Sequence, residues 1–139
     1  MTKSSDIFGV KPYKLKKSED YMNNAQIEHF RSILVSWREG LMDETMQTVH
    51  HMQDESANFP DPADRASQET DMAIELRNRD RDRKLVKRID KTISTLDDEY
   101  GYCESCGEEI GIKRLEARPT ATQCIDCKTL DEIREKQMA

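Results

Sequence analysis

The chain has 139 residues, of which 36% are charged and 35% are hydrophobic, with three Phe, one Trp and four Tyr. So little apolar material excludes a thick globular core and suits long helices that each bury one narrow stripe. No apolar run approaches the length of a membrane span, and no N-terminal segment resembles a secretion signal. We therefore expect a soluble, cytoplasmic, mainly helical (all-α) protein.

The formal net charge of −6 is concentrated in one part of the sequence. Residues 54–75 contain seven acidic side chains and one basic side chain, Arg65, so this segment alone carries the excess of the whole chain. Because an acidic surface repels phosphate backbones, direct DNA binding by this segment is not expected.

Residues 1–22 are predicted to form an extended arm that packs on the base of the protein. The segment contains Gly9 and Pro12 and shows little periodicity. Its apolar side chains, which are the candidates for contacts with the rest of the chain, are Ile7, Phe8, Val10 and Tyr13. The lysine cluster in the arm is interpreted as solvated surface.

Residues 23–98 are predicted to form an antiparallel coiled-coil hairpin. The first helix is expected to begin at Asn23 or Asn24, either of which suits an N-cap, and to continue to about Ser56. A helix of this length would extend roughly 50 Å at about 1.5 Å per residue. Apolar side chains recur in it at alternating spacings of three and four, as in a coiled-coil seam: Ile27, Phe30, Leu34, Trp37 and Leu41.

The turn of the hairpin is predicted at about residues 57–66. Two prolines in Phe59-Pro60-Asp61-Pro62 interrupt the helix, because proline lacks an N–H and pushes the preceding residue out of the α region. The second helix is expected to begin near Asp64, with Asp61 or Asp64 as its cap, and to continue to about Asp98. Its apolar side chains are Ala73, Leu76, Leu85, Ile89, Ile93 and Leu96.

The carboxylates of Asp61 and Asp64 at this tip can be interpreted in two ways. In the first interpretation they cap the helix, since an acid near a helix N-terminus is stabilising by about 0.3–1 kcal/mol. That accounts more easily for one carboxylate than for both. The other interpretation is a probe that presents carboxylates to a metal ion, to basic side chains or to backbone donors in a larger partner.

Eight consecutive polar residues, 77–84, interrupt the apolar pattern of the second helix. Some of them must face the first helix, near Glu44 and Thr45. A solvated charge ladder with i,i+4 pairs such as Asp80–Lys84 is one interpretation, and it is favoured by the residues alone. A binding face on the shaft of the hairpin is the other.

The four cysteines of the chain form two C-x-x-C pairs separated by seventeen residues. This spacing predicts a structural zinc ion with four thiolate ligands, Cys103, Cys106, Cys124 and Cys127. Gly107, directly after the second cysteine, suits the tight turn that a bound thiolate requires. A closed site of this kind has no open coordination position and favours architecture over catalysis.

Two other interpretations of the cysteines are weaker. A disulfide framework suits a small secreted chain, and a redox C-x-x-C needs one pair beside a strand–helix unit. Residues 99–123 are therefore expected to form a zinc-finger module with a small core of Ile110, Ile112 and Leu115.

Residues 124–139 are expected to form a C-terminal helix, running from about Ile125 to Lys136 and packing through Leu130 and Ile133. The histidines lie on the first long helix and are expected at the surface rather than as metal ligands: His29, His50 and His51.

The cysteine module also contains Ile110, Arg114 and Pro119 at fixed distances from the cysteines, and this pattern resembles the zinc-finger signature of the DksA/TraR family. The tip segment 58–66, the shaft segment 75–81 and the ending 133–138 resemble the same family. The likeness covers nearly the whole chain from about Val10 onward.

The resemblance implies a monomeric bacterial transcription regulator that enters the secondary channel of RNA polymerase and does not bind DNA or act as an enzyme. It implies that the coiled-coil tip alters promoter open complexes together with the alarmone guanosine tetraphosphate (ppGpp) in the stringent response. By motif match the tip residues are Asp61, Asp64 and Ala66, and the polymerase-contacting shaft residues are Asn78 and Arg81. The ppGpp-binding residues are Leu85, Arg88, Arg118 and Lys128. With this resemblance, the binding-face interpretation of residues 77–84 replaces the charge ladder.

One departure from the family concerns position 88, where relatives carry Lys and this chain has Arg. The charge is kept, but the two side chains differ in geometry, so the affinity for the alarmone is expected to differ.

Two alternative functions remain at this stage. One is a transcript-cleavage cofactor in the manner of the Gre factors, with magnesium held at the acidic tip. The other is a zinc-ribbon nucleic-acid binder, which would require a basic face that residues 99–123 do not offer, because five acids stand against three bases there.

Overall fold

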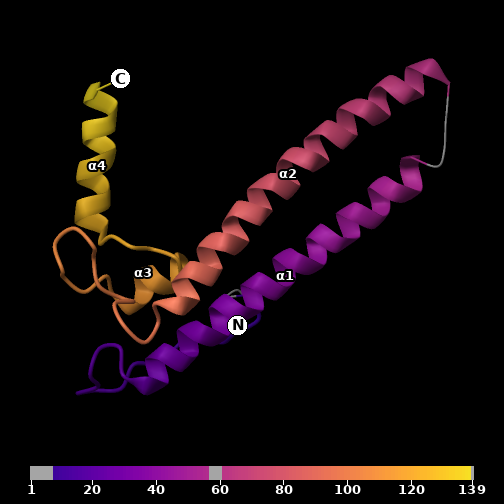
Figure 1. Ribbon diagram of the computed structural model, residues 1–139. Helices are drawn as coiled ribbons and strands as arrows, with labels where there is room; N and C mark the ends of the chain where they lie inside the picture. The colour runs from indigo at the N-terminus through magenta and orange to yellow at the C-terminus, as the bar shows by residue number, and fades with distance from the viewer. Residues whose placement is uncertain (1–7, 57–60, 139) are drawn as a thin grey trace, which may run out of the picture. The chain divides into compact units, whose positions relative to one another are not determined.

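The computed structural model describes residues 8–56 and 61–138 (Figure 1). Its helices are α1 (Asn24–Ser56), α2 (Pro62–Ser94), α3 (Ile112–Ala117) and α4 (Ile125–Met138). The described residues contain no strand and only isolated bridge residues, among them the antiparallel pair Tyr102 and Glu109, so the prediction of a mainly helical fold is confirmed. None of these helices is both long and apolar enough to cross a membrane.

The chain divides into two compact units. The hairpin unit is Trp37–Asp90, and the base unit consists of the described residues on either side of it, 8–36 and 91–138. In the hairpin unit, residues 37–56 of α1 and 62–90 of α2 run side by side in opposite directions (Figure 1). Residues 57–60 of the predicted tip, including Phe59 and Pro60, lie outside the described residues.

Both long helices begin at a polar cap. The Asn23 side-chain oxygen accepts the N–H of Gln26 at 2.9 Å, and the Asp61 carboxylate accepts the N–H of Asp64 at 3.0 Å. These bonds satisfy N–H groups that have no partner within the helix. Helix α2 starts two residues earlier than expected because Pro62 occupies the first helical position, where a missing N–H costs nothing.

Helix α2 also ends earlier than expected, at Ser94 rather than near Asp98. The hydroxyls of Ser94 and Thr95 donate to the carbonyls of Lys91 and Thr92, at 2.6 Å and 2.9 Å. Such bonds to nearby carbonyls compete with the helical pattern. The Leu96 N–H then donates to Ile93 O, which tightens the last turn.

The seam of the hairpin unit becomes polar along its length. Leu41 and Ile89 are buried, whereas Glu75, Arg79 and Asp82 on α2 are half-buried. Two residues of the polar run 77–84, Arg79 and Asp82, are therefore partly covered, as expected of a run that spans two turns of the helix. The Asp80–Lys84 pair of the charge-ladder interpretation does not form: both side chains are exposed, and within the described residues neither makes an ion pair.

The core of the base unit joins α1 to the zinc-finger module. Its fully buried side chains include Phe30, Ile33 and Leu34 from α1 and Leu115 from α3. The ring of Phe30 lies 5.7 Å from that of Tyr100, between ring centroids, at an interplanar angle of 52°. The predicted core residues Ile110 and Ile112 are also buried.

The variant Leu115→Ala should lower the free energy of unfolding by about 2–5 kcal/mol, because it removes buried methyl groups and leaves a cavity. Leu115 has no exposed surface. Urea titration followed by circular dichroism measures this difference. The matched control is Leu130→Ala on an exposed position, for which we expect a change below about 0.5 kcal/mol.

The C-terminal helix does not pack as predicted. Leu130 and Ile133 are 53% and 47% exposed, and α4 has no buried residue. Polar contacts at the start of the helix hold it instead: the Gln123 amide donates to the Asp131 carboxylate at 2.7 Å and to the Ser105 hydroxyl at 3.0 Å.

His29 is also placed differently from the prediction of a surface side chain. Only 9% of its side chain is exposed, and its Nε2 lies 3.0 Å from the Glu116 carboxylate. The same carboxylate accepts the backbone N–H of Tyr13 from the arm at 2.9 Å. The periodicity of α1 does not reveal this environment, because it is built by segments 87 residues apart. His50 and His51 are exposed, as predicted.

Candidate functional site

Cys103 and Cys106 lie on a tight loop that closes a short hairpin. The Cys103 N–H donates to Glu108 O at 2.8 Å, and the Gly107 N–H donates to Cys103 O at 2.9 Å. Gly107 has φ +77°, a conformation that glycine adopts without a steric penalty. The Ser105 N–H points at the Cys103 sulfur, 3.4 Å away, as expected of a loop that stabilises a thiolate.

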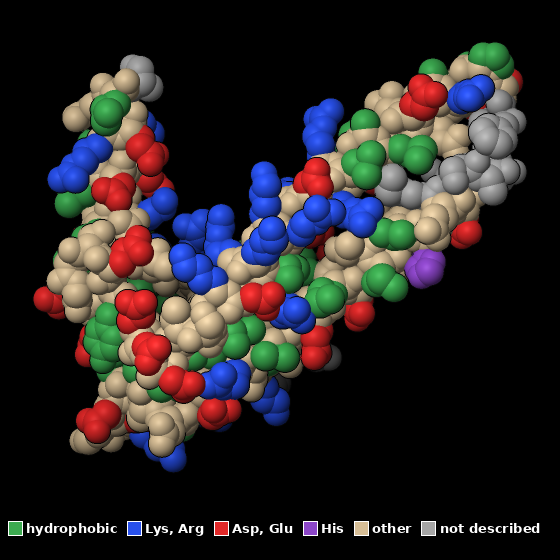
Figure 2. Space-filling model, in the orientation of Figure 1, with side chains coloured by type: hydrophobic (Ala, Val, Ile, Leu, Met, Phe, Trp, Pro, Cys, Tyr) green, Lys and Arg blue, Asp and Glu red, His purple; other side chains and the backbone are tan. Residues whose placement is uncertain are grey.

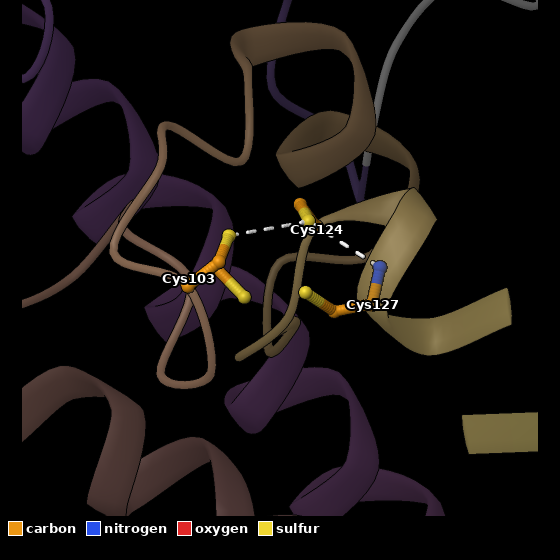
Figure 3. Close-up of side chains that lie close together, drawn as sticks. Cys103, Cys124 and Cys127 are labelled. Atoms are coloured by element: carbon orange, nitrogen blue, oxygen red, sulfur yellow. Dashed lines mark hydrogen bonds between the residues drawn. The ribbon is translucent and has the colours of Figure 1, made fainter. Parts of the chain in front are cut away.

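The second pair lies at the start of α4. Cys124 directly precedes the helix and Cys127 is in its first turn, where the Cys127 N–H donates to the Cys124 sulfur at 3.5 Å (Figure 3). The Glu104 N–H donates to Thr122 O at 2.8 Å and so joins the two cysteine loops. Arg114 supports the same region, since its Nε donates to Gln123 O at 3.0 Å.

The four sulfur atoms converge on one point. All lie within 4.8 Å of one another, and those of Cys106 and Cys124 are 3.8 Å apart. Figure 3 shows the sulfur atoms of Cys103, Cys124 and Cys127 turned toward one another. A zinc–sulfur bond of about 2.3 Å in a tetrahedron places sulfur atoms about 3.8 Å apart. The cysteines therefore fit one structural zinc ion with no open position.

The ionisation of the four thiols also favours a bound cation. Burial raises the pKa of Cys103, but N–H groups of Cys124, Cys106 and Ser105 outweigh it, and the pKa falls to about 6. The pKa of Cys127 is raised, mainly because its thiol is hydrogen-bonded to that of Cys124. Four negative charges this close repel one another, so all four thiols ionise together only around a cation.

The predicted tip residues lie at the start of α2: Asp61 directly precedes the helix, and Asp64 and Ala66 are in its first two turns. Asp61, Asp64 and Ala66 are all exposed. Asp61 is occupied as the helix cap, whereas the Asp64 carboxylate has no hydrogen-bond or ion-pair partner among the described residues. The two carboxylates are therefore not equivalent, and the one without an intramolecular partner is Asp64.

A row of basic side chains follows one face of α2 in the hairpin unit. Arg77, Arg81, Lys84 and Arg88 recur at spacings of four, three and four, and all are exposed. Figure 2 shows Lys and Arg side chains gathered along this helix. Asn78, the other predicted shaft residue, is exposed beside the row. The spacing places these cations on one stripe, away from the half-buried residues of the seam.

The four predicted ppGpp residues are divided between the units. Leu85, which is half-buried, and Arg88 belong to the hairpin unit. Arg118, which follows α3, and Lys128, in the first turn of α4, belong to the base unit. Arg118 is exposed and Lys128 is half-buried.

One residue near the metal centre was missed by the sequence analysis. Tyr21 of the arm bonds to backbone groups of Gly101 and Gly111 at the foot of the Cys103–Cys106 hairpin. In the sequence, the only sign that another segment approaches this hairpin closely is the glycine at each of its ends, Gly101 and Gly111. No local pattern indicates which residue approaches.

Comparison with known proteins identifies two family matches along the chain. Residues 26–96 match the family described as "DnaK suppressor protein DksA, N-terminal domain", and residues 98–132 match "Prokaryotic dksA/traR C4-type zinc finger". The chain is 65% identical over 135 residues to "RNA polymerase-binding transcription factor DksA" of Haemophilus influenzae, covering 96% of this chain and 93% of the relative. Identity to the protein of the same name from Escherichia coli K12 is 67% over 134 residues, covering 96% and 89%.

A solved structure has a similar fold. The structure of transcription factor DksA2 from Pseudomonas aeruginosa matches with a TM-score of 0.78 and 37% sequence identity. The match covers 86% of this chain and 94% of the other. All these relatives are named as transcription factors, and none of the names denotes an enzyme.

Proposed function

We propose, because this chain belongs to the DksA/TraR family, that it is a non-enzymatic transcription regulator that binds RNA polymerase. The observation that carries the proposal is identity of 65–67% over 96% of the chain to proteins named for this function. The closed zinc site adds to it, since a metal with four protein ligands stabilises a fold and offers no position for a substrate.

We further propose that the hairpin enters the secondary channel of the polymerase and places its tip near the active centre, where it alters the stability of promoter open complexes. Support comes from the exposed carboxylates of Asp61 and Asp64 at the start of α2. A carboxylate without an internal partner is available for a metal ion, a basic side chain or a backbone donor of the polymerase.

The shaft of the hairpin is proposed to contact the polymerase through Asn78 and Arg81. Both are exposed, and Arg81 lies in the basic row on α2. Within the described residues, Arg81 forms no ion pair, so its guanidinium is available for acidic groups of a partner. Arginine suits this role because its planar fork binds carboxylates in bidentate geometry.

The alarmone ppGpp is proposed to bind between this protein and the polymerase, at Leu85, Arg88, Arg118 and Lys128. Three of these side chains are cationic, as recognition of phosphate groups requires. Arg88 retains the charge of the lysine expected there but binds phosphate with a different geometry.

In this proposal the protein acts in the cytoplasm as a monomer and does not bind DNA directly. The described part of the acidic segment, at the start of α2, contains Asp61, Asp64, Glu69, Asp71 and Glu75 against one arginine, Arg65. A surface of this charge repels a phosphate backbone.

The proposal is tested by the lifetime of open complexes on a promoter sensitive to the stringent response, with purified polymerase. The protein should shorten the lifetime, and ppGpp should shorten it further. A parallel assay on stalled elongation complexes separates this function from that of a Gre-like cofactor: stimulated transcript cleavage would favour the second. An unchanged lifetime together with no binding to polymerase would contradict the proposal.

Arg118→Ala should reduce the contribution of ppGpp and spare the effect of the protein alone. One lost charge-assisted contact corresponds to about 1.5–3 kcal/mol, or roughly tenfold to a hundredfold in alarmone affinity. The measurement is the open-complex lifetime across a ppGpp titration. Lys113→Ala, an exposed cation of the same module outside the proposed site, is the control. Equal loss of both effects would count against this site.

A further inference from the structure

The hydroxyl of Tyr21 connects the N-terminal arm to both ends of the hairpin that carries half of the metal site. It donates to Gly101 O at 2.7 Å and accepts the N–H of Gly111 at 2.9 Å. Gly101 O also accepts the N–H of Ile110 at 2.8 Å, and this bond closes the foot of the hairpin. Cys103 and Cys106 lie on the loop at its other end.

The arm packs closely against the foot of the hairpin at Gly101. A Cβ on Gly101 would lie 2.8 Å from Cγ and Sδ of Met22, and Gly101 has φ +93°, so only glycine suits this position. The Tyr21 ring packs edge-on against Tyr102, next to Cys103, with ring centroids 5.5 Å apart. Burial raises the pKa of Tyr21, and its hydroxyl therefore stays a protonated donor over the physiological range.

The bond to Gly111 is the only one that satisfies this N–H among the described residues. Gly111 also begins α3, since its carbonyl accepts the N–H of Leu115 at 3.1 Å. Loss of the Tyr21 hydroxyl would thus free both the outgoing end of the cysteine hairpin and the first turn of the helix that follows it.

We propose that Tyr21 is a positioning residue for the metal, which holds the Cys103–Cys106 half-site in the geometry that the cation needs. The arm and the metal site are then coupled. Because such coupling is reciprocal, a hydroxyl that stabilises the metal-bound hairpin implies a metal that stabilises the arm. The spacing of the cysteines does not reveal that the metal site depends on Tyr21, because Tyr21 is about eighty residues from the hairpin in sequence.

The test is the rate of zinc release from the full-length, zinc-loaded protein to a colorimetric chelator. Tyr21→Phe should release zinc up to roughly tenfold faster. Removing a hydrogen-bond partner of a ligand costs about tenfold to a hundredfold in metal affinity, and Tyr21 acts one step further out, through Gly101 and Gly111. Tyr102→Phe is the matched control. It keeps the ring pair and removes a hydroxyl with no partner among the described residues, so its release rate should equal that of the wild type. Equal rates for Tyr21→Phe and Tyr102→Phe would overturn the proposal.

Two further measurements separate positioning from a general loosening of the arm. Tyr13→Phe removes the bond from the Tyr13 hydroxyl to Glu19, which anchors the arm without touching the hairpin, so it should leave zinc release unchanged. Acceleration equal to that of Tyr21→Phe would contradict a specific role of the Tyr21 hydroxyl. In the wild type, chelation of zinc should increase hydrogen exchange at the amides of residues 19–23, and unchanged exchange would contradict the coupling.

Discussion

We expect the variant Asp64→Asn to bind RNA polymerase as the wild type does and to lose its effect on promoter open complexes. The substitution keeps the shape of the side chain and removes its charge. It leaves the helix cap intact, because the capping carboxylate belongs to Asp61. The lost interaction with the helix dipole amounts to at most about 1 kcal/mol, too little to unfold α2.

The measurement is the open-complex lifetime at saturating protein, with binding to polymerase followed separately. Asp71→Asn is the matched control, since it removes an exposed carboxylate from the same helix outside the tip. This control should retain the wild-type effect. If Asp64→Asn still shortens the lifetime of promoter complexes, Asp64 is not the acting group of the tip.

The second large effect is expected for Cys124→Ser. With one thiolate replaced, the site loses a ligand, and zinc bound per chain should fall from about one to near zero after dialysis against a weak chelator. Since the free energy of metal binding, about 10–16 kcal/mol in zinc-finger peptides, is also folding free energy, the base unit should lose its cooperative thermal transition.

Metal content is measured by atomic absorption and folding by thermal denaturation. The control Glu108→Gln alters an exposed, non-ligand side chain beside the first cysteine loop and should keep both zinc and the transition. Zinc affinity should also fall as the pH is lowered, because protons compete with the metal for the thiols. A fully folded Cys124→Ser variant with an unchanged melting temperature would remove the argument for a structural zinc ion.

The elements of the fold were predictable because each has a local cause. The seam of α1 follows from the spacing of Phe30, Leu34 and Leu41, all of them buried. Proline chemistry predicts the break between the long helices. The spacing of the cysteines predicts the metal centre, because a C-x-x-C loop restricts where two sulfurs can lie, whatever surrounds it.

Two of the errors concern the surroundings of a side chain or helix, which the local sequence does not encode. His29 lies on a helix whose periodicity gives no warning of Glu116, 87 residues later. Helix α4 carries apolar residues at helical spacing, but polar bonds from Gln123 hold its start and Leu130 stays exposed. Amphipathic spacing predicts that a helix has an apolar face and does not say whether this chain covers that face.

The proposal that the tip of the hairpin lies beside the catalytic centre of RNA polymerase can be tested by crosslinking from the tip. A photoreactive phenylalanine at position 66, an exposed site in the second turn of α2, would be activated in the complex with polymerase and the linked peptides identified. We predict crosslinks to polymerase segments that line the nucleotide entry route next to the active site. Crosslinks confined to the outer surface of the polymerase, in a complex that still alters promoter lifetimes, would contradict this placement of the tip.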